Sequence, residues 1–154
     1  MKTLKIALMT LVAACTLVAC DKETTAEMIE GSYTGYTEAK FQYSPNPIYA
    51  DDEKMTISVN GSIAVDIAGQ FAQWGNLSAS GVECTLSGDN VNLTGKGKLT
   101  MQGHGGGDPT TYDVEISGSV AKDRSAFDLT LNVPSVMGGT VIAFRNGKAP
   151  QTEE

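Results

Sequence analysis

The feature that most constrains the fold is an alternation of apolar and polar residues with a period of two, which recurs from Gly31 onward. In residues 91–102 the odd positions are Val, Leu, Gly, Gly, Leu and Met, whereas the even positions are Asn, Thr, Lys, Lys, Thr and Gln. Successive side chains of a β-strand point to opposite faces, so this pattern predicts a strand with one dry and one wet face. Residues 112–120 and 127–133 repeat the pattern.

Short turns separate about eight such segments, and no stretch shows helical periodicity. In "MTISVNGSIAVDI" the pair Asn60-Gly61 predicts a hairpin with a type I′ turn. A slip of parity at Ser80-Gly81 predicts a β-bulge. Strands with one apolar face must close or stack to hide it, and sequential hairpins favour an up-and-down barrel or a sandwich. We therefore expect an all-β protein with a closed antiparallel up-and-down barrel of about eight strands.

The first 19 residues have the layout of a signal peptide. Lys2 and Lys5 precede an apolar run that is too short to span a bilayer permanently. The run ends in "LVAC", which resembles the bacterial lipobox; the resemblance implies cleavage before Cys20 and lipidation of its thiol. A lipobox ending at Cys15 also fits but leaves a shorter apolar run, and an ordinary secretory signal is the other interpretation. Two or three acyl chains at Cys20 would anchor the protein stably to a membrane.

The remaining chain divides into three parts. Residues 20–30 are polar and predict a flexible tether, residues 31–150 a single barrel domain, and residues 151–154 a C-terminal tail. The acidic residues just after Cys20 resemble surface-export signals of some Gram-negative lipoproteins, but an aspartate there signals inner-membrane retention in enteric bacteria. We expect attachment to the outer membrane, with the periplasmic or surface face left open.

Charge and cysteine content exclude several classes of function. Without the two leader lysines, nine basic residues face 18 acidic ones, a net charge of −9. There is no basic patch for a nucleic acid. Cys84 is the one cysteine left in the mature domain, so no intramolecular disulfide is expected. Its thiol is either reactive or, as we favour, a small buried apolar group.

The string "MQGHGGGDP" contains His104, the only histidine, in an HGGG spelling typical of oxyanion-hole loops in esterases. No Gly-x-Ser-x-Gly accompanies it, and His104 would have to serve as both loop element and base. The chain also lacks the four Cys or His ligands of structural zinc. The acidic run 51–53 reads as a solvated loop, with a weak cation site as the alternative. We therefore expect no enzyme activity, no metal and no cofactor, with His104 at the rim of the barrel.

Three strings carry a resemblance to a known family. They are "GSYTGYTEA", "TYDVEISGSV" and "VPSVMGGTVIAFRNGKAP", and they resemble the calycin-like β-barrel lipoproteins of Gram-negative gut anaerobes. The resemblance covers nearly all of residues 31–150 and implies a lipocalin-like closed barrel. By analogy of fold it also implies a small apolar ligand. The Gly-x-Trp of lipocalins is absent near the first strand, because the single tryptophan is Trp74.

Two hypotheses of function follow for an envelope lipoprotein of this shape. The first is binding of a small apolar or amphipathic molecule inside the barrel; the second is an interaction or accessory role with a barrel filled by side chains. Glycines at inward positions 95, 97 and 118 either permit tight coiling, which we favour, or leave room for a ligand. Val136 and Met137 form a lid or part of the core. The candidate ligand-lining residues, or alternatively the plug of a filled barrel, are Tyr33, Phe41, Trp74, Met101, Met137 and Phe144.

Overall fold

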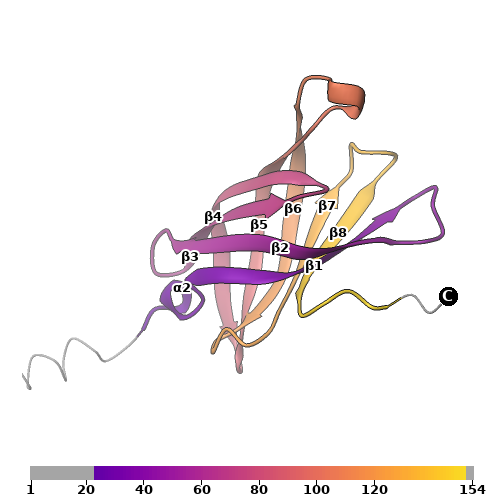
Figure 1. Cartoon of the computed structure of the whole chain (residues 1–154). Helices are drawn as coiled ribbons and strands as arrows, with labels where there is room; N and C mark the ends of the chain where they lie inside the picture. The colour runs from indigo at the N-terminus through magenta and orange to yellow at the C-terminus, as the bar shows by residue number, and fades with distance from the viewer. Residues whose placement is uncertain (1–22, 152–154) are drawn as a thin grey trace, which may run out of the picture.

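The protein is a single closed β-barrel whose eight antiparallel strands follow one another around the barrel in chain order (Figure 1). The computed structural model describes residues 23–151. The expected up-and-down barrel is therefore confirmed. The strands are β1 (Gly31–Phe41), β2 (Ile48–Val59), β3 (Ala64–Phe71), β4 (Gly75–Ser87), β5 (Asn90–Met101), β6 (Thr110–Ala121), β7 (Phe127–Val133) and β8 (Thr140–Asn146).

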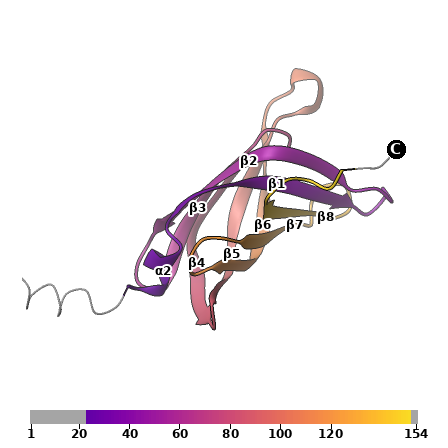
Figure 2. The ribbon, with the colours of Figure 1, turned by 60° about the horizontal axis from the view of Figure 1, so that its bottom comes forward.

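The first and last strands close the barrel. Their ladder is continuous from Phe41 opposite Thr140 to Gly35 opposite Asn146. Figure 2 shows β1 lying beside β8 after the view is turned. Closure leaves no unpaired strand edge along this ladder, which removes the usual route to edge-to-edge association.

The period-two alternation places apolar side chains inside and polar ones outside. In β7, for example, Phe127, Leu129, Leu131 and Val133 are buried and the residues between them are more exposed. The inward side chains of all the strands form one core cluster. Within residues 23–151, no helix has the length and hydrophobicity required to cross a bilayer.

A short helix, α2 (Thr25–Met28), packs into the barrel end that carries the β2–β3, β4–β5 and β6–β7 turns, here called the helix end. Thr24 and Glu27 form a reciprocal capping box. Ala26 and Ile29 are completely buried, and the Ala26 amide donates to the Ser62 carbonyl at 3.2 Å. The expectation of a flexible tether over residues 20–30 is therefore wrong from Thr24 onward, because two apolar side chains are buried here.

The loop between β2 and β3 differs from the expected two-residue turn. Four residues, 60–63, separate the strands, and Gly61 has positive φ whereas Asn60 does not. A type I′ turn needs positive φ at both central residues, so that prediction is wrong. The Asn60 side chain instead donates to Asp66 at 2.8 Å, and Ile63 of the loop is 60% exposed.

The predicted bulge at Ser80-Gly81 is confirmed. The β3–β4 register shifts between Val65 and Ile67, and the β4–β5 register shifts between Ala79 and Glu83. Gly81 has a φ of 68°, and its amide donates to the Asp66 carboxylate at 3.0 Å. Asp66 thus joins the bulge to Asn60 of the neighbouring loop, and these hydrogen bonds lower the pKa of its carboxyl group.

Candidate functional site

Aromatic side chains form a connected column in the interior. The Phe144 ring lies 5.4 Å from that of Phe71 and 4.8 Å from that of Phe127. Tyr33 meets Phe127 edge to face at 5.3 Å and donates its hydroxyl hydrogen to the Ile29 carbonyl at 2.5 Å. Burial raises the pKa of Tyr33 to about 12, with a smaller opposing effect from Arg124. Tyr33 and Phe144 thus contact other side chains as packed core residues do.

At the opposite end, here called the loop end, lie the β1–β2, β3–β4, β5–β6 and β7–β8 connections. Phe41 and Trp74 pack there with ring centroids 5.7 Å apart. The buried indole of Trp74 donates to Thr37 Oγ1 at 3.1 Å. Met101 is partly buried against the same core. All three candidates are therefore in contact with the core.

Val136 and Met137 of the β7–β8 loop lie in different environments. Val136 packs against the core, whereas Met137 is 62% exposed with a φ of 49°. Met137 does not line the interior. His104 begins the short 3-10 helix η1 (His104–Gly106) in the β5–β6 loop, which places its backbone at the loop end.

The inward glycines are explained by neighbouring protein atoms. A Cβ at Gly118, where φ is 149°, would overlap the Asp128 carbonyl oxygen and lie 2.8 Å from Leu129 Cα. A Cβ at Gly97 would lie 2.7 Å from the Ser78 carbonyl oxygen. The absent side chains therefore allow neighbouring strands to approach closely, which favours the coiling interpretation over space for a ligand.

Glu53 is the buried ionisable residue that sequence reasoning missed. Only 1% of its surface is exposed; Oε1 accepts from the Ala72 amide at 3.2 Å, and buried Oε2 has no partner in the described chain. Burial raises the pKa of this carboxyl group, and the Ala72 hydrogen bond offsets part of the effect. The solvated-loop interpretation is wrong here: Glu53 shares the inward parity of Met55 and Ile57, and that parity was the available signal.

Cys84 packs as a structural residue of the core. Cys84 is buried and its thiol contacts the Val82 carbonyl at 3.7 Å. Burial, with a smaller effect of the Glu83 charge, raises the pKa of this thiol to about 11, so the reactive thiolate is disfavoured. Within residues 23–151, no three His, Cys, Asp or Glu residues are grouped as metal ligands would be.

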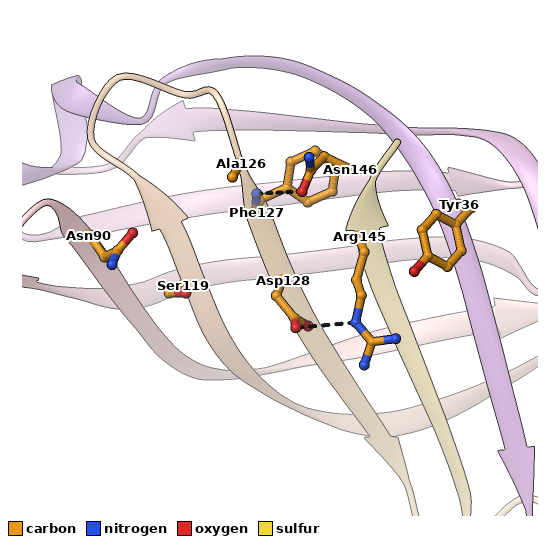
Figure 3. Close-up of a pocket in the computed structure, with 8 residues that line it drawn as sticks. All are labelled: Tyr36, Asn90, Ser119, Ala126, Phe127, Asp128, Arg145 and Asn146. Atoms are coloured by element: carbon orange, nitrogen blue, oxygen red, sulfur yellow. Dashed lines mark hydrogen bonds and ion pairs between the residues drawn. The ribbon is translucent and has the colours of Figure 1, made fainter. Parts of the chain in front are cut away.

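A depression of about 260 Å³, with polar and charged side chains along its wall, lies on the outer face where β6, β7, β8 and β1 run side by side (Figure 3). Asp128 and Arg145 lie opposite each other on β7 and β8, and Asp128 Oδ2 accepts from Arg145 Nε at 3.2 Å. At the upper end of the view, Asn146 accepts from the Phe127 amide at 3.2 Å. The lining residues are Tyr36, Asn90, Ser119, Ala126, Phe127, Asp128, Arg145 and Asn146.

Charges around the depression are paired. Arg145 Nη1 also lies 3.5 Å from Glu38 Oε1, and Lys40 Nζ lies 3.1 Å from the same oxygen. Burial opposes ionisation of Glu38, but hydrogen bonds from Lys40 and Tyr49 outweigh it and lower the pKa of the carboxyl group. The charged side chains in and beside the wall of the depression are therefore paired with one another.

The geometry defines a class: an up-and-down antiparallel barrel with a side-chain core and depressions on its outer face. The chain belongs to the Calycin-like beta-barrel domain family, whose model matches residues 29–148. A crystal structure of a "putative outer membrane protein" from Bacteroides fragilis is similar in fold, with 23% sequence identity and a TM-score of 0.61. The match covers 81% of this chain and 46% of that one, so this chain spans about half of its neighbour. No curated protein sequence matches this chain.

Proposed function

We propose that this protein is a lipid-anchored component of the cell envelope that acts through its outer surface, as an interaction or accessory protein with a filled barrel. The observation that carries this proposal is the aromatic column of Phe71, Phe144, Phe127 and Tyr33, whose rings pack against one another in the interior of the barrel. Ligand sites are concave cavities that enclose most of their ligand, and these rings contact one another instead. The filled interior favours this hypothesis over binding of an apolar molecule inside the barrel.

An engineered cavity tests whether side chains fill the interior of the barrel. Phe144→Ala removes a completely buried ring and should leave an apolar void that binds benzene, as dry engineered cavities do. We expect benzene to raise the melting temperature of Phe144→Ala and to leave that of the native protein unchanged; Phe144→Leu is the milder variant should Phe144→Ala not fold. Stabilisation of the native protein by benzene, or bound fatty acid in native mass spectrometry of the full chain, would overturn the filled-barrel proposal.

Mutation of Cys20 tests whether this residue carries the lipid anchor. Cys20 lies outside the described residues, and its lipidation is supported by the "LVAC" string at the end of the apolar leader. Cys20→Ala should abolish labelling by radioactive palmitate and release the protein from membranes. Cys15→Ala and Cys84→Ala are matched controls and should remain labelled and membrane-bound. Labelling lost in Cys15→Ala and retained in Cys20→Ala would move the anchor to the earlier cysteine.

A further inference from the structure

One row of outward side chains crosses the depression in Figure 3 at right angles to the strands. Ser119 on β6 lies opposite Asp128 on β7, Asp128 opposite Arg145 on β8, and Arg145 opposite Tyr36 on β1. Neighbouring strands are spaced by roughly 4.8 Å, so the row is about 14 Å long. It presents a hydroxyl, a carboxylate, a guanidinium and a phenol in that order, at successive positions of one continuous sheet.

The charges of this row point to a neutral ligand. Arg145 is paired with Asp128 and Glu38, at 3.2 and 3.5 Å, so the row has no surplus charge that would select an ion. A guanidinium carries five donors and a carboxylate only acceptors, so the row offers both kinds of hydrogen-bonding group within one strand spacing. A ligand that matches it must also carry donors and acceptors side by side, as the hydroxyl groups of a sugar do.

An aromatic pair adjoins the row. Tyr36 and Tyr49 lie 6.4 Å apart at an angle of 50°, and the Tyr49 hydroxyl hydrogen bonds to Glu38, which raises the pKa of Tyr49. Tyrosine supplies a rigid apolar ring with a polar tip and loses little conformational entropy on binding. Such rings complement the C–H faces of a pyranose, while the neighbouring polar groups complement its hydroxyls.

We propose that this depression, from Ser119 to Tyr36, binds a neutral oligosaccharide. The inference rests on the proposed function, because it assigns the ligand to the outer surface rather than to the interior. The mechanism is hydrogen bonding of sugar hydroxyls to Asp128 and Arg145, with Tyr36 packed against a sugar ring. The volume of about 260 Å³ is slightly below that of sites for drug-sized ligands, as expected for an open groove that leaves part of a bound oligosaccharide exposed.

Isothermal titration calorimetry of the full chain tests this assignment, in a detergent without a sugar headgroup. The probes are maltotriose, cellotriose and triacetylchitotriose, with trigalacturonic acid as the anionic comparison. We expect saturable binding of at least one neutral trisaccharide and weaker binding of trigalacturonic acid. Tyr36→Ala and Asp128→Asn should each weaken binding at least tenfold. The exposed loop residue Tyr43 provides a matched control, since Tyr43→Ala should leave affinity unchanged.

Two outcomes would overturn the assignment: no saturable heat with any neutral trisaccharide, or equal affinity for the native protein and both row variants. Circular dichroism and tryptophan emission verify that each variant is folded, and Tyr36→Phe keeps the ring should Tyr36→Ala not fold. Membrane attachment of the same preparations is measured separately. Absence of sugar binding by the native protein, with its palmitate labelling intact, would refute this inference and leave the proposed envelope role standing.

Discussion

The indole Nε1 of Trp74 donates a 3.1 Å hydrogen bond to Oγ1 of Thr37 inside the loop end of the barrel. Both side chains are buried, Thr37 completely. The bond joins β1 to the β3–β4 turn across 37 positions of the sequence. A buried indole N–H without an acceptor pays its full desolvation cost, so this contact helps to fix the position of Trp74.

Replacing Thr37 tests that role. Thr37→Val keeps the shape of the side chain and removes the acceptor, and should lower the free energy of unfolding by about 1–3 kcal/mol. Urea titration followed by tryptophan emission measures it directly, because Trp74 is the only tryptophan. Thr56→Val, at an exposed position of β2, should change stability by less than about 0.5 kcal/mol. Equal stability of both variants would show that the bond contributes nothing.

The buried carboxyl group of Glu53 predicts a dependence of stability on pH. Its pKa in the folded protein is raised by burial, so the folded state binds the proton more tightly than the unfolded state does. The contribution of Glu53 is therefore fully present below its ordinary pKa and is lost as pH rises through the raised value. Glu53→Gln should be more stable than the native protein at pH 8, and the difference should shrink towards pH 4.

Urea titrations of the two proteins at several pH values measure this effect. Asp66 and Glu38 have lowered pKa values and act in the opposite direction, but they are common to both proteins and cancel in the difference. Gln retains an acceptor for the Ala72 amide, which makes it the appropriate replacement. A stability difference that does not vary with pH would contradict the assignment of a raised pKa to Glu53.

The segment before β1 should behave as part of the fold. Ile29 is completely buried, so Ile29→Ala should cost about 2–5 kcal/mol, the usual range for such a truncation in a core. Glu30→Ala is the control: the exposed side chain is removed, whereas the Glu30 carbonyl still accepts from Arg124 Nη1 at 2.7 Å. Thermal unfolding followed by circular dichroism compares them. A flexible tether would instead make the two variants equally stable.

A mutation at Gly118 distinguishes two explanations of this glycine, which are close approach of neighbouring strands and space for a ligand. Gly118→Ala places a methyl group against the Asp128 carbonyl oxygen and Leu129, and should destabilise the protein by about 1–3 kcal/mol more than a glycine replacement in open space. Gly61→Ala is that comparison, with a φ of 107° and no atom within 4 Å of the added Cβ. Chemical denaturation of both variants measures the difference, and a well-tolerated Gly118→Ala would indicate unfilled space.

Much of the architecture could be predicted from the sequence because the alternation of side chains is a local property of extended backbone. The strands around Val91, Val114 and Leu129, and the bulge at Gly81, follow from parity alone. The Asn60-Gly61 turn was misjudged because Asn60 bonds to Asp66, a partner outside the hairpin loop. Residues 24–30 were misjudged because a four-residue helix is too short to show periodicity; its stability comes from packing.

The sequence by itself determined which side of each strand is apolar and how many strands the barrel contains, since both depend on neighbouring residues. Only the tertiary structure decided what occupies the interior and what the outer face presents. Phe71 of β3 and Phe144 of β8 meet across the interior because β8 closes against β1, and the same closure places Arg145 beside Tyr36. Such contacts depend on strand register and barrel curvature, which join residues that no local pattern relates.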